Sequence, residues 1–328
     1  MGMVMEVGKK VKPLGFGYPA QVRRGRTRVG WIGIGVMGGA MATRLLAAGF
    51  TVTAYARTSV KADALVAAGA SVADSPASVA AASDVVFTMV SDPGDVRAVV
   101  LDRASGALAG LRPGGVLVDC TSSSPSLARE IAAAARSAGC HAVDAPVSGG
   151  DAGARDGTLA ILAGGDEAVV AWLAPLFAHL GTPTHMGPPG SGQSSKIANQ
   201  MAVAGAVVGA VVGLSESLAF ADAAGLDARL FLDAVSKGAA GSRVMDIFGT
   251  RAVSRDFASG PGSARYIIKD LGMALEIGDG QEEEDEATAL PGAALFRQMF
   301  SAMVANGDGD LCVRGLITVI ERLSGVHK

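Results

Sequence analysis

The chain has 328 residues, of which 49% are hydrophobic and only 18% are charged. A hydrophobic fraction this large excludes a disordered protein, and the length is sufficient for two domains. The 45 glycines follow no three-residue period, which excludes a collagen-like chain. The net charge of −3 is too small to indicate a nucleic-acid partner. The three cysteines and four histidines have no metal-ligand spacing, so we expect no metal site and no structural disulfide.

Residues 1–28 hold seven lysines and arginines but one acidic residue, Glu6, which gives this segment a formal charge of +6. Residues 1–27 show no hydrophobic period, and we expect them to form a flexible basic head. Such a head is either a targeting segment or a solvated tail. A transit peptide would be amphipathic and rich in serine, so the sequence favours a cytoplasmic location, with a mitochondrial location as the alternative.

Short apolar strands alternate with helices between residues 28 and 191. This alternation predicts an α/β domain built on a parallel, doubly wound sheet, which is the Rossmann arrangement. The strands that we expect span residues 29–34, 51–55, 84–90 and 115–119, and the helices span residues 41–48 and 60–67.

The alternation stops before residues 192–328, which show only helical patterns. They predict an all-helical C-terminal domain, joined to the first domain by a long helix over residues 194–223. The apolar run 201–214 within this helix has 14 residues. A membrane span needs about 20, so we expect a buried core helix and no membrane partner. Further helices are expected over residues 228–235, 266–277, 292–306 and 311–324.

A glycine motif, GxGxxG, lies at Gly33, Gly35 and Gly38, directly after the first expected strand and before a helix. Its glycines permit a tight turn and allow the backbone to approach a pyrophosphate closely, while the helix N-terminus attracts the phosphates. The motif therefore predicts a dinucleotide site, with an ordinary turn as the alternative.

The end of the second expected strand indicates which dinucleotide is bound. An NAD site would place an acidic residue here to hold the ribose hydroxyls. The stretch contains Arg57 and Thr58 instead, and a guanidinium group suits a 2′-phosphate. The sequence favours NADP, with NAD as the alternative cofactor and an exposed basic turn as the alternative interpretation.

Three later motifs carry the groups that could act on a substrate. Residues 119–125 place hydroxyl side chains at the end of a strand, where doubly wound folds bind ligands, although such a loop is also a common helix cap. Residues 144–150 end in a Ser-Gly-Gly turn whose amides suit a carboxylate. Lys196 and Asn199 are three positions apart on the long helix, hence on one face. A lysine that faces inward there is costly without a function or a partner, and the alternative interpretation is a surface lysine near the start of the helix.

These five motifs, in this order and spacing, resemble the β-hydroxyacid dehydrogenase family over about residues 29–323. The likeness is strongest to the plant 3-hydroxyisobutyrate dehydrogenase-like group, through residues 238–242 and 269–272, and extends to glyoxylate/succinic semialdehyde reductases. The resemblance implies an NADP-dependent oxidoreductase that transfers hydride between NADP(H) and a small β-hydroxyacid or a carboxylate-bearing aldehyde. It also implies a 6-phosphogluconate dehydrogenase-like C-terminal domain and a homo-oligomer. Glycines spaced by four along the long helix agree with close packing.

The same resemblance assigns roles to individual residues. Those that bind the cofactor are Gly33, Gly35, Val36, Met37, Gly38, Arg57, Thr58, Val90, Ser91, Asp95, Ser122 and Lys269. Those that bind the substrate are Thr121, Ser148, Gly149 and Gly150. The catalytic residues are Lys196, which acts as the proton donor, Asn199 and Lys269.

The sequence departs from the family pattern at three places. The hydroxyl pair has the order Thr121-Ser122, and Ala56 replaces an asparagine that contacts adenosine. Residues 278–288 add about five residues, several of them acidic, and we expect them to form a surface loop. Two other functions were weighed: a catalytically silent NADP-binding module on the same fold, and nucleic-acid binding through the basic head. The retained Lys196 argues against the first, and the absence of a nucleic-acid-binding motif in the basic head argues against the second.

Overall fold

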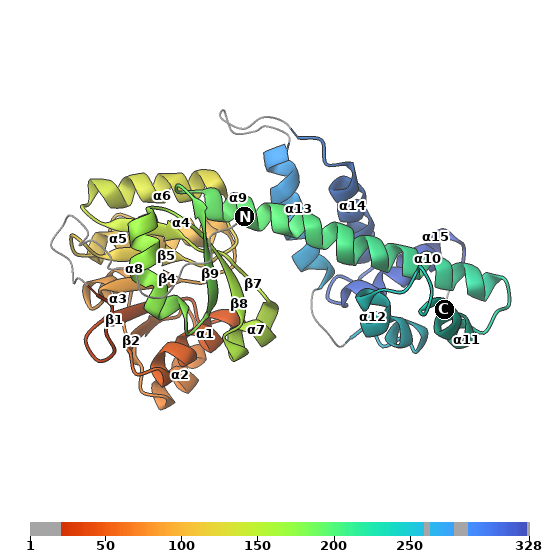
Figure 1. Cartoon of the computed structure of the whole chain (residues 1–328), viewed down its shortest axis with the longest axis horizontal. Coiled ribbons are helices and arrows are strands. Elements are labelled where there is room, and N and C mark those ends of the chain that lie inside the picture. The colour runs from red at the N-terminus through yellow and green to blue at the C-terminus, as the bar shows by residue number, and fades with distance from the viewer. Residues whose placement is uncertain (1–20, 259–262, 279–287, 327–328) are drawn as a thin grey trace. The chain divides into compact units, whose positions relative to one another are not determined.

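The computed structural model describes residues 21–258, 263–278 and 288–326, and the chain divides into two compact units. The first unit is Met1–Lys196 and the second is Ile197–Lys328, so the boundary lies inside a helix, a few residues after the expected one (Figure 1). Most of the basic head and most of the acidic insert, namely residues 1–20 and 279–287, lie outside the described residues.

The first unit is built on one nine-stranded sheet with the order β3-β2-β1-β4-β5-β6-β8-β7, and β9 pairs with β8. The strands from β3 to β6 along this order are parallel. The strand bounds are β1 Arg28–Ile32, β2 Thr51–Tyr55, β3 Ser71–Val72, β4 Val85–Thr88, β5 Val116–Asp119, β6 His141–Asp144, β7 Val147–Ser148, β8 Leu159–Gly164 and β9 Gly181–Gly187.

The predicted parallel, doubly wound sheet is confirmed, and one edge of it contains antiparallel pairs. Strand β8 runs antiparallel to both β6 and β7. The connection from β7 to β8 contains only the short helix α7 (Gly150–Asp156) and a few flanking residues. A parallel return needs a crossover of about a dozen residues or more, so this connection reverses the strand direction instead.

Helices cover both faces of the sheet, as in a Rossmann fold (Figure 1). Neighbouring residues of one strand enter different cores: Trp31 packs in the cluster with Phe87 and Phe177, and Ile32 packs in the cluster with Leu117. Two buried faces explain why the strands are almost entirely apolar. The remaining helices of this unit are α1 Val36–Ala47, α2 Asp63–Ala67, α3 Pro76–Ala81, α4 Pro93–Leu101, α5 Ala107–Gly110, α6 Pro125–Ser137 and α8 Glu167–Phe177, with a 3-10 turn at Ser59–Ala62.

The described regular elements of the second unit are helices, and the expected order of a Rossmann domain followed by a helical domain is confirmed. The expected long helix consists of α9 (Ser191–Val203), a π-helical turn (Ala204–Val208) and α10 (Gly209–Ala223). The sequence analysis missed α12, which Ser242 caps by accepting the Met245 N–H. The other helices are α11 Ala228–Val235, α12 Arg243–Val253, α13 Ala264–Gly278, α14 Pro291–Ala305, a 3-10 turn Val313–Leu316 and α15 Ile317–Leu323.

The long helix, Ser191–Ala223, is apolar and long enough to cross a membrane by length and composition alone. Core helices of soluble proteins meet the same criterion. One face of α10 packs into the core of the second unit through Val211, Leu214 and Leu218. Only 33% of the most apolar window of the long helix is buried within the chain, so much of its surface remains accessible.

Candidate active site

The turn between β1 and α1 has the shape that a dinucleotide site requires. Gly33 adopts a φ of +99°, and a Cβ there would lie 2.2 Å from the carbonyl oxygen of Met89. A Cβ at Gly38 would lie 2.1 Å from the carbonyl oxygen of Gly33, so both glycines are needed for the turn itself. At Gly35, the N-cap of α1, a Cβ would meet no heavy atom within 4 Å. The backbone at Gly35 is therefore open to a ligand.

A cavity of about 340 Å³ opens at this turn. The first turn of α1 contains no acidic residue, so the positive end of its dipole suits a pyrophosphate. Lys61, which the sequence analysis did not assign to the site, also lines the cavity. The residues at this turn thus fit a dinucleotide cofactor. The lining residues are Ile34, Gly35, Val36, Gly39, Thr43, Lys61, Ala64 and Leu65.

Two of the residues expected to bind the cofactor meet at the surface. The guanidinium Nη1 of Arg57 donates to Oδ1 of Asp95, in the first turn of α4, over 3.0 Å. The side chain of Arg57 is 79% exposed, and exposed ion pairs are weak, so a phosphate can compete for this arginine. Thr58, which follows Arg57, is also exposed.

The loop after β5 is organised by the buried carboxylate of Asp119. Asp119 accepts hydrogen bonds from the Thr88 hydroxyl at 2.7 Å and from the Thr121 N–H at 3.0 Å. Burial raises the pKa of Asp119 to about 6, against the opposing effect of these hydrogen bonds. The Thr121 hydroxyl accepts a hydrogen bond from the Val90 N–H at 3.0 Å, so its oxygen is already engaged within the protein. Ser122 is less buried and is the more accessible member of the predicted pair.

Strand β6 ends beside β5, and Asp144 there contacts the start of α9. Its two carboxylate oxygens accept the N–H groups of Gly190 and Gln193, at 2.8 and 2.9 Å. Burial raises the pKa of Asp144 to about 6. The predicted substrate turn follows Asp144 in the chain. Ser148 is half-buried, and Gly149 and Gly150, whose φ values are +136° and +64°, lie at the surface.

Lys196 and Asn199 both lie on α9, and Lys196 faces inward rather than lying at the surface. Lys196 is only 5% exposed, and Asn199 is half-buried. The amide of Asn199 donates to Oε1 of Gln200 over 3.2 Å, and the amide of Gln200 donates in turn to Asp270. Asp270 belongs to α13 and is almost completely buried.

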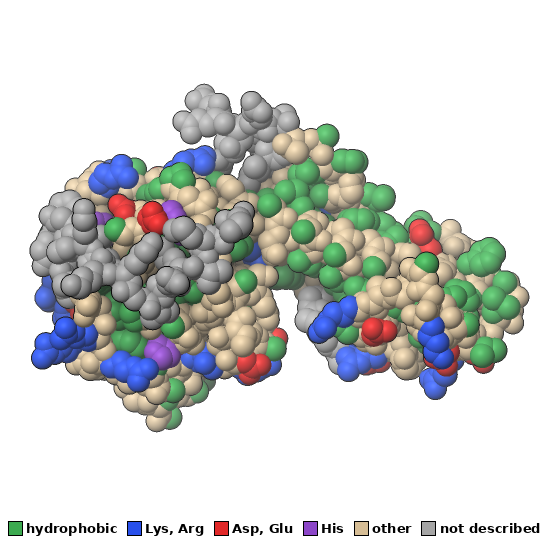
Figure 2. Space-filling view, in the orientation of Figure 1, with side chains coloured by type: hydrophobic (Ala, Val, Ile, Leu, Met, Phe, Trp, Pro, Cys, Tyr) green, Lys and Arg blue, Asp and Glu red, His purple; other side chains and the backbone are tan. Residues whose placement is uncertain are grey.

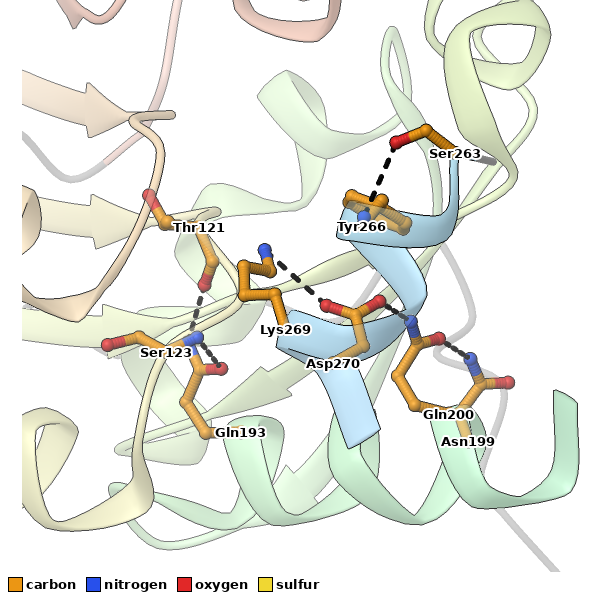
Figure 3. Close-up of polar contacts among 9 residues, drawn as sticks. All are labelled: Thr121, Ser123, Gln193, Asn199, Gln200, Ser263, Tyr266, Lys269 and Asp270. Atoms are coloured by element: carbon orange, nitrogen blue, oxygen red, sulfur yellow. Dashed lines mark hydrogen bonds and ion pairs between the residues drawn. The ribbon is translucent and has the colours of Figure 1, made fainter. Parts of the chain in front are cut away.

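Lys269 belongs to the same cluster of the second unit (Figure 3). Its ammonium lies 3.4 Å from Oδ1 of Asp270 and 4.9 Å from the ring centroid of Tyr266. Burial, and secondarily Asp270, raises the pKa of Tyr266 to about 12, so this phenol stays neutral. Gln200, Tyr266 and Asp270 were not predicted as site residues. The only sequence signal for them is that they lie next to, or one helix turn from, the predicted residues Asn199 and Lys269.

Among the described residues, no group of three or more histidine, cysteine, aspartate or glutamate side chains is arranged to hold a metal ion. The side chains described above provide lysine ammonium groups, hydroxyls and amides for the chemistry of the site.

Comparison with known proteins identifies the family. A family model described as the NAD binding domain of 6-phosphogluconate dehydrogenase matches residues 28–187. A second, described as NAD-binding of NADP-dependent 3-hydroxyisobutyrate dehydrogenase, matches residues 190–320. The chain belongs to the β-hydroxyacid dehydrogenase family. The predicted family is thereby confirmed, and the chain is an NAD(P)-binding oxidoreductase of the 3-hydroxyisobutyrate dehydrogenase type, which acts on CH–OH groups.

Individual family members are similar over most of the chain. The "probable 3-hydroxyisobutyrate dehydrogenase-like 3, mitochondrial" of Arabidopsis thaliana is 53% identical, over 94% of this chain and 92% of the relative. The 2-hydroxy-3-oxopropionate reductase of Escherichia coli is 37% identical, over 92% of this chain and 99% of the relative. The solved 3-hydroxyisobutyrate dehydrogenase of Mycobacterium tuberculosis, with L-serine, is 28% identical with a TM-score of 0.75, covering 90% of this chain and 99% of that one.

Proposed function

We propose that this enzyme transfers hydride between NADP(H) and a small β-hydroxyacid or a carboxylate-bearing aldehyde, with Lys196 as the proton donor. The observation that carries the proposal is the burial of Lys196, which is 5% exposed on an apolar helix. A buried ammonium is costly unless it has a partner or a function. Lys196 also lies one turn after Gln193, whose side chain binds the loop that carries Ser122.

The proposed roles follow from the charge and the protonation chemistry of each side chain. When bound, the nicotinamide cofactor supplies or accepts the hydride. In the reducing direction, the Lys196 ammonium donates a proton to the alkoxide oxygen that forms and stabilises its negative charge. In the oxidising direction, the neutral amine of Lys196 takes that proton back. Asn199 orients the substrate without exchanging a proton, and Lys269 adds a positive charge that Asp270 holds in place.

The proposed cofactor site consists of the glycine turn and the basic residues after β2. Val36, Met37 and the turn glycines hold the pyrophosphate at the start of α1. Arg57 and Thr58 read the 2′-phosphate, and Lys61 supplies a further positive charge at the cavity. The exposure of Arg57 and the absence of an acidic residue at this position favour NADP over NAD. The name of the family model over residues 190–320 agrees with this choice.

The substrate class is proposed from the predicted binding groups of the first unit. We assign the substrate carboxylate to the turn Ser148–Gly150, and we assign contacts with the substrate and the nicotinamide ribose to the hydroxyl pair Thr121-Ser122. The name of the Escherichia coli relative describes an aldehyde that carries a carboxylate, which supports the alternative activity of a glyoxylate/succinic semialdehyde reductase. One panel tests these assignments: glyoxylate, succinic semialdehyde and methylmalonate semialdehyde with NADPH or NADH, and 3-hydroxyisobutyrate with either oxidised cofactor. Absence of turnover with all four would contradict the proposed function.

We also infer a homo-oligomer. Only 33% of the most apolar window of the long helix is buried within the chain, and hydrophobic side chains gather over α10 and α11 (Figure 2). A Cβ at Gly205 or Gly213 would meet nothing within 4 Å, so the helix surface there is open to a second copy. Light scattering that returned a mass near 32.8 kDa at micromolar concentration would contradict this inference.

We also propose where in the cell the protein is located. The sequence favoured the cytoplasm, but the name of the Arabidopsis relative supports the mitochondrial alternative, which we now prefer. A reporter protein fused after residues 1–28 tests it. Import of the reporter into mitochondria is the expected result, and a purely cytoplasmic reporter would restore the first expectation.

A further inference from the structure

The side chain of Gln193 is completely buried and forms two hydrogen bonds with one loop. Its Nε2 donates to the carbonyl oxygen of Thr121 over 2.8 Å, and its Oε1 accepts the N–H of Ser123 over 2.8 Å (Figure 3). These two backbone groups lie on either side of Ser122. The amide of Gln193 thus fixes the backbone of the loop from both sides, while the Ser122 hydroxyl remains outside this arrangement.

The helix turn that carries Gln193 is itself held in place by hydrogen bonds to a buried carboxylate. The carboxylate of Asp144 accepts the N–H groups of Gly190 and Gln193, and so it caps α9 from the end of β6. The two positions beside this carboxylate need glycine, because a side chain there would collide with it. A Cβ at Gly164 would lie 2.6 Å from Oδ1 of Asp144, and a Cβ at Gly192 would lie 2.8 Å from Oδ2.

Lys196 follows Gln193 by three positions on α9, which places both side chains on the same face of the helix. Both are buried, so neither has the freedom of a surface side chain. The Gln193 amide therefore connects the loop at Ser122 to the helix turn that carries Lys196. All of these residues belong to the first unit.

We propose that Gln193 is a positioning residue, which sets the Ser122 loop and Lys196 in register so that proton and hydride transfer coincide. The proposal rests on the function proposed above, because it takes Lys196 as the proton donor. It predicts that loss of the Gln193 amide lowers kcat far more than it weakens cofactor binding, because the glycine turn and Arg57, which are proposed to hold the pyrophosphate and the 2′-phosphate, belong to other elements. A displacement of about 1 Å at a catalytic group can lower turnover about 10²-fold.

The first measurement detects the hydrogen bonds without using activity. Gln193→Met preserves the approximate side-chain volume but removes both hydrogen bonds. Hydrogen exchange of the full-length variant, followed by mass spectrometry, should then be faster in the peptide that contains residues 120–124. Gln193→Glu keeps an acceptor for the Ser123 N–H but places a carboxylate oxygen against the Thr121 carbonyl oxygen, so it should also make exchange in this peptide faster.

The second measurement detects positioning. For Gln193→Met we expect kcat to fall about 10²-fold, with a much smaller change in the KM for NADPH and a larger isotope effect with 4-deuterated NADPH. A merely structural role would reduce the amount of folded enzyme and leave the isotope effect unchanged. Ser83→Ala is the matched control, because Ser83 is equally buried and loses a 2.7 Å hydrogen bond to the Val79 carbonyl. This control should retain the wild-type kcat and isotope effect.

The results separate this inference from the proposed function. Faster exchange in residues 120–124 together with the lowered kcat and the larger isotope effect supports it. Wild-type exchange there, or a wild-type kcat and isotope effect in a folded Gln193→Met variant, overturns it while leaving the activity in place. If the wild-type protein turns over none of the four substrates, the proposed function fails, and the role of Gln193 as a positioning residue for that reaction fails with it.

Discussion

The glycine turn between β1 and α1 yields a prediction that separates folding from cofactor binding. A Cβ at Gly38 would lie 2.1 Å from a backbone carbonyl oxygen, whereas a Cβ at Gly35 would meet no heavy atom within 4 Å. Gly38→Ala should therefore destabilise the fold, because backbone atoms must move to admit the methyl group. Gly35→Ala should fold like the wild type and bind NADPH poorly, because its methyl group occupies the approach of the pyrophosphate.

The magnitudes follow from the two environments. Overpacking a tight site costs about 1–3 kcal/mol or more, and the better helix propensity of alanine over glycine returns about 1 kcal/mol. At about 2–4 °C per kcal/mol, the Tm of Gly38→Ala should fall by several degrees. At Gly35 alanine is a poorer N-cap than glycine, but it lowers the entropy of the unfolded chain by about 0.4–1 kcal/mol. These two effects oppose each other, so the Tm should change little.

Calorimetry and fluorescence titration of NADPH test both variants side by side. For Gly35→Ala we expect the Kd for NADPH to rise about tenfold or more, which corresponds to about 1.4 kcal/mol. Wild-type NADPH affinity in this variant would refute the assignment of the open space at Gly35 to the cofactor. Equal losses of Tm in the two variants would refute the steric argument.

Three other predictions concern charged groups. Lys196→Met keeps the bulk of the buried stem but removes the ammonium, so turnover should fall about 10²–10⁴-fold with unchanged NADPH affinity; a variant that keeps a tenth of the activity, with hydride transfer rate-limiting, would contradict the role. Arg57→Ala should raise the KM for NADPH and barely alter that for NADH, and equal effects would show that Arg57 does not read the phosphate. Asp144 has a pKa of about 6, above its ordinary 3.8, so its contribution to stability is present at low pH and is lost as pH rises through about 6. In Asp144→Asn, denaturation from pH 4 to 7 should show a shallower dependence on pH, and an unchanged slope would contradict the shift.

Much of the fold could be predicted from the sequence because its signals are local. The expected helix over residues 228–235 has the bounds of α11, and every expected strand overlaps an observed one. Helix α12 was missed although its signal was present: Val244, Phe248 and Ala252 are spaced by four after the capping Ser242. The antiparallel strand β8 was not predictable in the same way, because its direction depends on how the short connection from β7 closes in three dimensions.

The same difference between local and long-range signals applies to the site residues. Motifs with a fixed local spacing, such as the glycine turn and Lys196, could be found in the sequence. Gln193 and Asp270 could not, because their contacts join segments about 70 residues apart, from Gln193 to Thr121 and from Gln200 to Asp270. No local pattern distinguishes a buried amide from an exposed one.

Several buried polar groups of the first unit lie where the chemistry is proposed, and their burial has an energetic cost. The cores of the first unit are apolar, yet Asp119, Asp144, Gln193 and Lys196 are all buried at the carboxyl ends of β5 and β6 and at the start of α9. Burial alone disfavours each of the charged groups, as the raised pKa values of the two aspartates indicate. Backbone N–H groups offset part of this cost for the aspartates, and they do so only in one arrangement of loop and helix. The same hydrogen bonds that make these carboxylates tolerable therefore fix the geometry around Lys196, which is why we expect catalysis, rather than folding alone, to depend on them.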